Sequence, residues 1–308
     1  YVQASSSGVV TMGDLSQDAK NDIVYVEGFD PSKDLPFITI DEESNSISAA
    51  GVFVPFQFLD KDKVKLDINK FIIIESLFLN ISEIERKKEE VAAAKSKIPV
   101  SQFKNSEFFH RENLSLKESL KAKSGIIAEF KRKSPSKGLI NGEADVLEVA
   151  KSYENCGASG ISVLTDTHFF GGSIQDVLTI RNEIKIPLLR KDFMIDEYQF
   201  YEAKSIGADV VLLIAACLSP SQVKDFTSLS HELGMEVLLE IHTESELTHF
   251  NKDIDLVGIN NRNLKDFKVD LQHSVHLKNF LPKETLSVAE SGIYSVEDFR
   301  FLKEKGFN

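Results

Sequence analysis

Short apolar runs alternate with helical patterns from residue 126 to the end of the sequence. The runs are rich in β-branched residues, which is typical of buried strands, and their ranges are Ile126–Phe130, Gly160–Leu164, Ile186–Leu189, Asp209–Ile214, Glu236–Leu239, Leu256–Ile259 and Leu286–Ala289. The segments between them carry apolar residues at helical spacing, namely Asp145–Cys156, Ser173–Ile184, Glu197–Ile206, Ser219–Leu233 and Ser295–Lys305. Strands that alternate with helices in this way predict βαβ units and a parallel sheet.

The predicted strands begin about every 20–35 residues, which is the repeat of a βα unit in a TIM barrel. Four glycines follow helical patterns, as glycines at helix C-termini do; they are Gly157, Gly207, Gly234 and Gly306. A barrel closes with eight strands, whereas this sequence shows seven. The predicted fold class is therefore α/β, a (β/α)8 TIM barrel truncated after its seventh βα unit. A doubly wound sheet is the alternative, but the first βα turn lacks the Gly-rich fingerprint of that fold.

A different pattern precedes the barrel. Glu83–Lys97 is charged and rich in Ala and predicts a helix, and Ser115–Lys123 predicts another. Residues 1–80 contain apolar runs separated by Gly, Asn, Pro and Asp, which indicate strands; the runs are Ile23–Val26, Phe37–Ile40, Val52–Phe58 and Val64–Ile68. We therefore expect an unassigned β-rich segment over 1–80, either part of a separate domain or misjoined, and a barrel domain over 81–308.

Composition and charge limit the classes of partner. The net charge of −12 argues against nucleic acid or an anionic membrane as the main partner. Residues 1–84 hold 14 acidic and 6 basic residues, so the remainder carries only −4 and an anionic substrate needs a local positive pocket. We expect a cytoplasmic protein, because there is no apolar run of about 20 residues, no secretory signal and only two cysteines without metal-ligand spacing. The sequence does not indicate an oligomeric state.

Ionisable and polar residues follow the C-terminal ends of five predicted strands, which is where TIM barrels hold their active sites. They are Glu129 and Lys131 on the first strand, Lys191 after the third, Glu240 after the fifth, Asn260 and Arg262 after the sixth, and Glu290, Ser291 and Gly292 after the seventh. Each alone could be an exposed charge at a strand end. Together they predict one shared site, since a purely structural rim has no reason to collect them.

Three features near these strand ends suggest specific chemistry. Glu129 and Lys131 lie two residues apart, so on a strand they point to the same side. The turn that follows offers Ser134 and Lys137 as a phosphate cradle. Lys191 closes an apolar strand, where partial desolvation is expected to lower the pKa of its ammonium and allow general acid catalysis. By contrast, the histidines His168, His231, His242 and His249 lack ligand-like spacing, and we expect surface or loop positions for them and no metal.

The runs AEFKRKSPSKG, LLRKDFM, LLEIHT, GINNRNL and VAESGI resemble, in order and spacing, signature segments of the indole-3-glycerol-phosphate synthase family, over about residues 85–308. The resemblance implies a carboxy-lyase of tryptophan biosynthesis. Its substrate would be 1-(2-carboxyphenylamino)-1-deoxyribulose 5-phosphate, and its products indole-3-glycerol phosphate, CO2 and water. No cofactor is implied, because loss of CO2 restores the conjugation of the ring.

The resemblance also implies roles for individual residues. Lys191 corresponds to the general acid at the ketone, Glu240 to the carboxylate of the later proton transfers, and Glu129 with Lys131 to the pair for dehydration and for the substrate carboxylate. Asn260, Arg262 and Ser291 would position substrate and catalytic groups. Ser134 and Gly292 match phosphate contacts, Phe170 and Phe193 match aromatic walls, and Glu290 is placed with the substrate-binding residues. Which of Lys131, Glu129 and Glu240 handles each proton stays open.

The sequence departs from the family at both ends. An eighth strand with its Gly-rich turn is not seen, and residues 76–84 lack the apolar spacing of the family's leading helix. We therefore expect weak or no activity and poor solubility of this chain, since open sheet edges favour aggregation. Two alternatives are another phosphate-binding barrel, such as phosphoribosylanthranilate isomerase or the tryptophan synthase α subunit, and an inactive remnant whose residues 1–80 have a binding role.

Overall fold

The computed structural model describes residues 84–135, 138–262 and 269–307 with their side chains, and before them the backbone of eight short strands. The chain divides into two units, Tyr1–Leu79 and Asn80–Asn308. The helix predicted over Glu83–Lys97 is present over residues 84–97. No helix in the described ranges is long and apolar enough to cross a bilayer.

The strands of the first unit are all paired antiparallel. β1 (Val2–Ala4) pairs with β2 (Val10–Met12), β7 (Phe58–Asp60) pairs with β8 (Lys63–Val64), and one sheet has the order β3 (Asp22–Val24), β4 (Ile38–Asp41), β5 (Ser46–Ala49) and β6 (Val52–Pro55). The four predicted apolar runs overlap β3, β4, β6, β7 and β8. The strands β1, β2 and β5 were not predicted, because their short stretches carry few large apolar residues.

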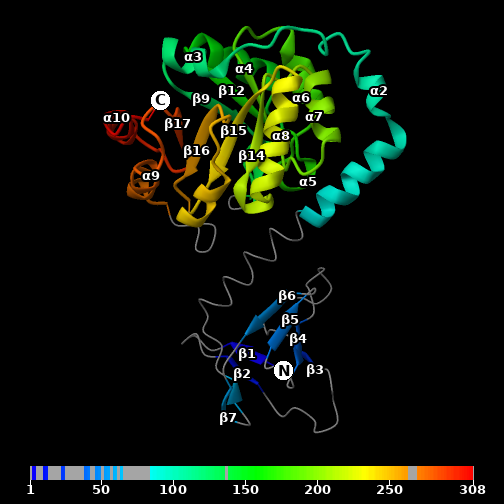
Figure 1. The fold of residues 1–308 in the computed structure, drawn as a ribbon, viewed down its shortest axis with the longest axis vertical. Coiled ribbons are helices and arrows are strands. Elements are labelled where there is room, and N and C mark those ends of the chain that lie inside the picture. The colour runs from blue at the N-terminus through cyan, green and yellow to red at the C-terminus, as the bar shows by residue number, and fades with distance from the viewer. Residues whose placement is uncertain are drawn as a thin grey trace. The chain divides into compact units, whose positions relative to one another are not determined.

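The second unit is built on one parallel sheet of seven strands (Figure 1). Each strand pairs with the strand before it in the sequence, in the order β9 (Ile127–Phe130), β12 (Gly160–Leu164), β13 (Leu188–Lys191), β14 (Val210–Ile214), β15 (Glu236–Ile241), β16 (Leu256–Asn260) and β17 (Ser287–Glu290). All seven predicted strands are therefore present, and the prediction of a TIM-barrel type of parallel sheet is confirmed. β9 and β17 form the two edges of this sheet.

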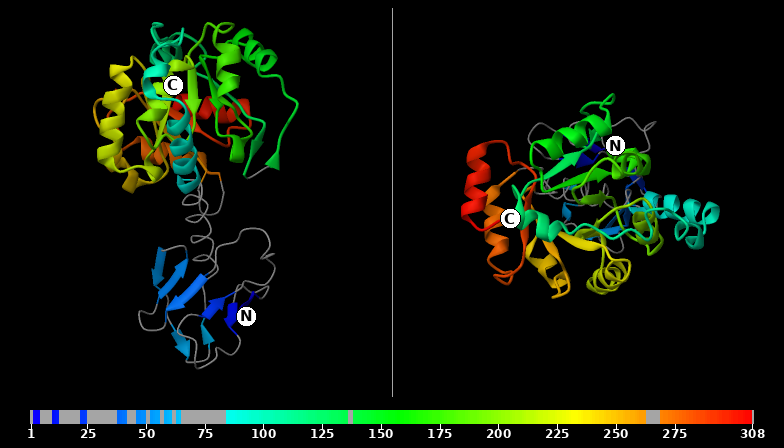
Figure 2. Two further views of the ribbon diagram at one scale, coloured as in Figure 1. Left: turned by 90° about the vertical axis from the view of Figure 1, so that its right-hand side faces the viewer. Right: turned by 90° about the horizontal axis from the view of Figure 1, so that it is seen from above.

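Helices follow most strands and cover the outer side of the curved sheet (Figures 1 and 2). They are α4 (Val146–Asn155), α5 (Thr167–Phe170), α6 (Ile174–Arg181), α7 (Tyr198–Ser205), α8 (Pro220–Glu232), α9 (Leu271–Lys278) and α10 (Val296–Glu304), with α2 (Val100–Phe103) and α3 (Leu116–Ala122) ahead of the sheet. Single 3-10 turns, η1 (Ala215–Cys217) and η2 (Glu244–His249), follow β14 and β15. The helices α2, α5 and α9 are not predicted from the sequence.

Local chemistry explains the ends of these helices. Ser219 caps α8 by accepting a hydrogen bond from Gln222 N–H, with Pro220 in the first turn, and Ser295 caps α10 in the same way from Asp298. The four glycines predicted at helix C-termini all have positive φ, between 75° and 86°. These caps fix where each helix ends and thus the lengths of the loops at both ends of the strands.

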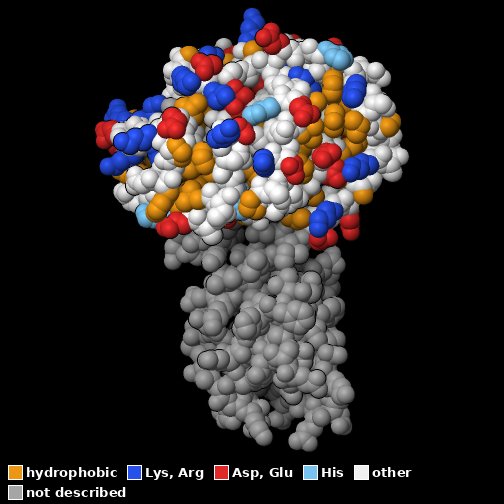
Figure 3. Space-filling model, viewed as in Figure 1, with side chains coloured by type: hydrophobic (Ala, Val, Ile, Leu, Met, Phe, Trp, Pro, Cys, Tyr) orange, Lys and Arg blue, Asp and Glu red, His pale blue; other side chains and the backbone are white. Residues whose placement is uncertain are grey.

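Apolar side chains fill both sides of the sheet. One cluster packs the strands against the helices and includes Phe200, Val211, Leu213, Leu239 and Ile259. Another lies on the inner side and joins Leu116 and Leu120 of α3 to Leu189, Leu212 and Leu238. Each such side chain stabilises the fold by roughly 1.5–3 kcal/mol when fully buried. The polar ends of the strands are therefore held by a rigidly packed apolar core. On the surface, charges of both signs are interspersed over the face shown in Figure 3.

Candidate active site

The candidate residues converge at the C-terminal ends of the strands. Lys191, Asn260 and Glu290 are the last residues of β13, β16 and β17, while Glu129 and Glu240 each stand one residue before the end of β9 and β15. The parallel register places Asn260 beside Glu290 on neighbouring strands. Because the strands are parallel, their C-terminal ends lie at the same end of the sheet, and these side chains lie there together.

Lys191 is the central cation of this end. Its Nζ lies 3.0 Å from Glu129 Oε2 and 2.9 Å from Glu290 Oε2. Glu129 also pairs with Lys131 through its other oxygen, Oε1. The prediction that Glu129 and Lys131 point to the same side agrees with this pair. Strands β9, β13 and β17 are thereby tied together by charge at the rim, although β9 and β17 are at opposite edges of the sheet.

The pKa of Lys191 differs from the sequence-based expectation. Burial alone would lower the pKa of this ammonium, but Glu129, Glu290 and Glu240 surround it and raise the pKa well above its usual value. The expected lowered pKa is therefore wrong. The sequence shows the apolar strand before Lys191. It does not show that its ammonium pairs with the carboxylates of Glu129 and Glu290 and is also attracted by that of Glu240.

Glu240 is held as a carboxylate by three neighbours. Its Oε1 accepts a hydrogen bond of 2.9 Å from Asn260 Nδ2 and lies 3.0 Å from His242 Nε2. Burial would raise the pKa of Glu240, but His242, Lys191 and Asn260 lower it to about 2. Burial would lower the pKa of His242, but Glu240 and Glu246 raise it to about 10. An imidazolium and a carboxylate thus form a buried pair beside Lys191.

His242 contacts the candidate site, and the sequence analysis did not place it there. We expected a surface or loop position, whereas its side chain is only 6% exposed. His242 does lie in the loop directly after β15, but it is buried there, whereas His168 and His231 are exposed. The available signal was the spacing in LLEIHT, because Glu240 and His242 lie two residues apart around a strand end and therefore share one side.

The surroundings of Glu129 and Glu290 shift the pKa values of the two carboxyl groups in opposite directions. Burial would raise the pKa of Glu129, but Lys191 and Lys131 lower it to about 2. Burial raises the pKa of Glu290, and repulsion by Glu240 and Glu129 adds to it, so that the attraction of Lys191 is outweighed. Glu290 Oε1 has no hydrogen-bond partner among the described residues. Carboxyl groups with separated pKa values are typical of sites that move protons.

The carboxylate of Glu290 occupies the space where Gly258 lacks a side chain. A Cβ on Gly258 would lie 2.0 Å from Glu290 Oε1. The close approach of this carboxylate therefore requires glycine at position 258. It explains why a residue that weakens a strand is found inside β16.

The loops after β16 and β17 meet through polar contacts. Asn260 Oδ1 accepts a hydrogen bond from the Arg262 backbone N–H, and Asn261 Nδ2 donates to the Ser291 carbonyl. Ser291 has a positive φ of 65°, which is uncommon for a residue other than glycine. Gly292 follows with φ 69°, and a Cβ there would lie 2.0 Å from Val269. The predicted residues Asn260, Arg262, Ser291 and Gly292 therefore belong to one connected rim.

The predicted aromatic walls lie beside each other. The rings of Phe170, at the end of α5, and Phe193, after β13, have centroids 6.4 Å apart. Ser134 is buried in β10 (Lys133–Ser134), which pairs with β11 (Gly138–Leu139) in the loop after β9. Lys137 lies outside the described residues. Ser134 and Gly292, the two predicted phosphate contacts, come from the loops after the two edge strands.

No group of three or more His, Cys, Asp or Glu side chains suited to a metal ion occurs among the described residues. The chemistry available here is that of ammonium, carboxyl, imidazolium and amide groups. They are arranged so that an ammonium is enclosed by carboxyl groups with different pKa values. Such a set can donate a proton or hydrogen bond to a developing oxyanion and accept a proton from carbon or nitrogen nearby.

A family model described as indole-3-glycerol phosphate synthase matches residues 82–308. A relative of that name from Bacteroides thetaiotaomicron is 47% identical over 225 residues, covering 73% of this chain and 86% of the relative. The chain belongs to the indole-3-glycerol phosphate synthase family. The sequence-based family prediction is confirmed, and another phosphate-binding barrel family is not supported.

Other relatives of the indole-3-glycerol phosphate synthase family are similar over the same part of the chain. One from Caldanaerobacter subterraneus is 44% identical over 222 residues, covering 71% of this chain and 86% of that protein. A solved chain from the tryptophan synthase complex of Pyrococcus furiosus has a TM-score of 0.46 at 15% identity, covering 60% of this chain and 85% of that chain. Membership of the synthase family rests on the sequence match.

Proposed function

We propose that this chain converts 1-(2-carboxyphenylamino)-1-deoxyribulose 5-phosphate to indole-3-glycerol phosphate, releasing CO2 and water, in tryptophan biosynthesis. The observation that carries the proposal is the cluster at one end of the sheet in which Lys191 pairs with Glu129 and Glu290 and is attracted by Glu240. It occurs in a chain of the indole-3-glycerol phosphate synthase family, a family of carboxy-lyases.

Ring closure is assigned to Lys191. The aromatic carbon that bears the carboxylate attacks the ketone carbon, and negative charge develops on the ketone oxygen. The Lys191 ammonium donates to that oxygen and protonates it. The raised pKa keeps Lys191 protonated before the reaction. Proton transfer to the oxygen remains possible because an alkoxide is a strong base.

Glu240 and Glu129 are assigned to the later steps. Loss of CO2 from the closed ring restores aromaticity, so no electron-sink cofactor is needed. Removal of the new hydroxyl as water then requires a proton donor at that oxygen and a base for the neighbouring CH2. Glu240 and Glu129, each with a pKa of about 2, are both available as bases. Lys131 stands beside Glu129. It can hold the substrate carboxylate until CO2 leaves and then donate the proton to the departing hydroxyl.

Substrate orientation is assigned to the rest of the rim. Phe170 and Phe193 enclose the anthranilate ring, which places its carbon against the ketone. Ser134 and Gly292 bind the phosphate, and Asn260, Arg262, Ser291 and Glu290 position the ribulose part and the catalytic groups. All of these residues fall within 81–308, which we propose as the catalytic domain, with 1–80 as a separate β-rich segment and the cytoplasm as the site of action.

The decisive experiment measures indole formation by the purified full chain. The chain contains no Trp, so indole fluorescence of the product stands out from that of the protein. We expect weak turnover by the wild type that is abolished in Lys191→Ala while substrate binding remains measurable. Lys151→Ala, which removes an exposed lysine paired with Glu183, is the control and should keep wild-type turnover. Equal turnover in Lys191→Ala and wild type would remove Lys191 from ring closure, and no indole from the wild type would contradict the proposal.

A further inference from the structure

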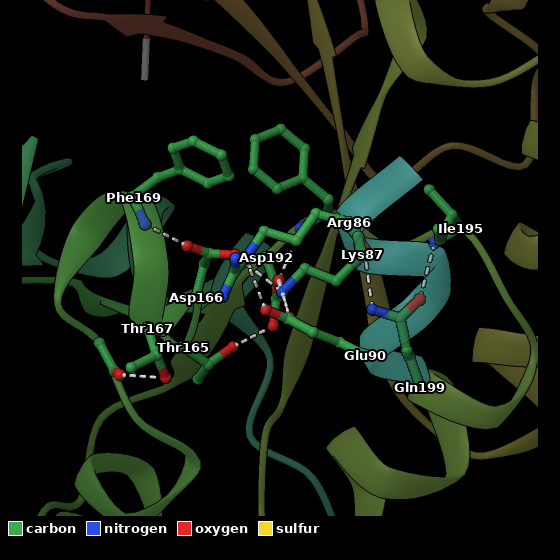
Figure 4. A network of polar contacts seen from close by, with 12 residues as sticks. Arg86, Lys87, Glu90, Thr165, Asp166, Thr167, Phe169, Asp192, Ile195 and Gln199 are labelled. Carbon is green, nitrogen blue, oxygen red and sulfur yellow. Dashed lines mark hydrogen bonds and ion pairs between the residues drawn. The ribbon is translucent and has the colours of Figure 1, made fainter. Parts of the chain in front are cut away.

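A buried ion network links the helix over residues 84–97 to the rim of the sheet (Figure 4). Lys87 Nζ lies 2.8 Å from Asp166 Oδ2, 2.9 Å from Asp192 Oδ1 and 2.8 Å from Glu90 Oε2. The Lys87 side chain is 7% exposed, and those of Asp166 and Asp192 are 1% and 3% exposed. Lys87 is not one of the site residues assigned above. Its two buried partners are close to such residues in the sequence, since Asp166 lies four residues before Phe170 and Asp192 lies between Lys191 and Phe193.

Asp166 supports the turn that carries Phe170. Its Oδ1 accepts a hydrogen bond of 2.7 Å from Phe169 N–H and so caps α5, while its carbonyl accepts one of 2.9 Å from Gly172 N–H. Both bonds fix the backbone on either side of Phe170. The remaining carboxylate oxygen, Oδ2, is the one that faces Lys87.

Asp192 supports Phe193 and stands next to Lys191 in the chain. Its Oδ1 accepts a hydrogen bond of 2.9 Å from Phe193 N–H and is also the oxygen that faces Lys87. Its Oδ2 binds Thr165 Oγ1 at 2.6 Å and Arg190 Nη2 at 3.1 Å. All four acceptor directions of this carboxylate are therefore used to hold one conformation of the strand end.

Docking of the helix does not explain why Lys87 is buried. Val91 of the same helix already packs in an apolar cluster with Phe103 and Tyr198, and Lys95 forms an exposed pair with Asp196 at 2.6 Å. A buried ion pair is poor at adding stability, because desolvation offsets most of its attraction. If its partners at positions 166 and 192 were apolar too, a methionine at position 87 would dock the helix as well. The charge at Lys87 therefore needs another reason.

We infer that Lys87 is a positioning residue for the proposed reaction. Its ammonium holds Asp166 and Asp192 at one separation, and these two carboxylates hold the backbone turns that present Phe170 and Phe193. Because Asp192 directly follows Lys191, the same contact fixes the strand end from which the Lys191 ammonium reaches the ketone. The inference rests on the proposed function, because its consequence is the alignment of ring, ketone and acid.

The test compares kcat and KM of Lys87→Met, Lys87→Arg and Lys95→Met in the full chain. We expect Lys87→Met to lower kcat by about 10–100-fold, since misplacement by about 1 Å costs that much, with KM changed by less than about threefold. Lys87→Arg keeps the positive charge at this position. Its kcat should be about tenfold or more above that of Lys87→Met. Lys95→Met removes the exposed ion pair that this helix makes with Asp196, and it should keep kcat within about twofold.

Thermal unfolding of each variant separates positioning from folding. A purely structural role predicts a lower Tm for Lys87→Met with unchanged kcat and KM at a temperature where the protein is folded, and that result overturns the inference. If Lys87→Met does not fold, Asp166→Asn takes its place, because asparagine still caps α5 but loses the charge facing Lys87. Wild-type kcat in Asp166→Asn overturns the inference, and a loss of kcat supports it.

The same measurements separate this inference from the proposed function. Absence of turnover in the wild type removes both together, whereas an active wild type with equally active Lys87 variants removes this inference alone.

Discussion

At the scale of single residues, His242 controls the ionisation of Glu240. His242→Gln removes the imidazolium that contributes most to holding the pKa of Glu240 at about 2, so that pKa rises. Because Glu240 acts as a carboxylate, we expect the acidic limb of the kcat–pH profile to move to higher pH in the variant. His276→Gln, at an exposed histidine paired with Glu244, is the control and should leave the profile unchanged. An unshifted limb in His242→Gln would show that His242 does not set the charge of Glu240.

The same residue makes stability depend on pH. Folding raises the pKa of His242 from 6.5 to about 10. A group with a raised folded-state pKa stabilises the fold fully below its unfolded pKa and loses that effect as the pH rises through the folded value. The Tm difference between wild type and His242→Gln should therefore be largest near pH 6 and shrink as the pH approaches 10. A difference that stays constant over this range would contradict the buried pair with Glu240.

At the scale of elements, the position of Glu290 depends on glycine in the neighbouring strand. Gly258→Ala places a Cβ against Glu290 Oε1 and pushes the carboxylate away from Lys191. We expect a stability loss of about 1–3 kcal/mol, as for overpacked sites, and a kcat loss of roughly tenfold or more. Urea unfolding and steady-state kinetics measure the two effects.

A double variant isolates the contact behind that prediction. In a Glu290→Ala background the carboxylate is gone, and the next neighbour of the new Cβ is Leu238 at an ordinary 3.6 Å. Gly258→Ala should then cost little additional stability. An equal cost in both backgrounds would place the strain elsewhere in β16.

Much of the element order follows from the sequence because each strand is a buried apolar run between capped helices. The predicted start of the third strand at Ile186 was two residues early, since β13 begins at Leu188, after Pro187, which has no N–H for the ladder. The helix α5 has only four residues and offers no period to detect. Chemistry at strand ends was predictable where a charge stands out, as at Lys191. The raised pKa of Lys191 and the buried pair of His242 with Glu240 depend on which strands become neighbours, and a linear pattern of residues does not contain that information.

At the scale of the whole second unit, the two ends of the sheet serve different purposes. Catalytic candidates occupy the C-terminal ends of the strands, whereas Asp209, directly before β14, organises the opposite end. Asp209 is fully buried and pairs with Arg181 at 2.7 Å and with Arg111. It also accepts hydrogen bonds from the backbone N–H groups of Leu188 and Leu114, at 2.9 and 2.8 Å. One carboxylate thus joins β13, β14, α6 and the segment ahead of α3.

This division predicts that stability and catalysis can be changed separately. Asp209→Asn leaves two arginines without their buried partner, so we expect a loss of about 3–5 kcal/mol in the free energy of unfolding. Because the apolar strands between the two ends are rigidly packed, kcat of the folded fraction should stay close to that of the wild type. Urea unfolding with kinetics at 25 °C measures both quantities, and Asp225→Asn at an exposed position of α8 is the matched control. A large fall in kcat without loss of stability would mean that the charged network at the base of the sheet reaches the catalytic rim, and the separation of the two ends would have to be abandoned.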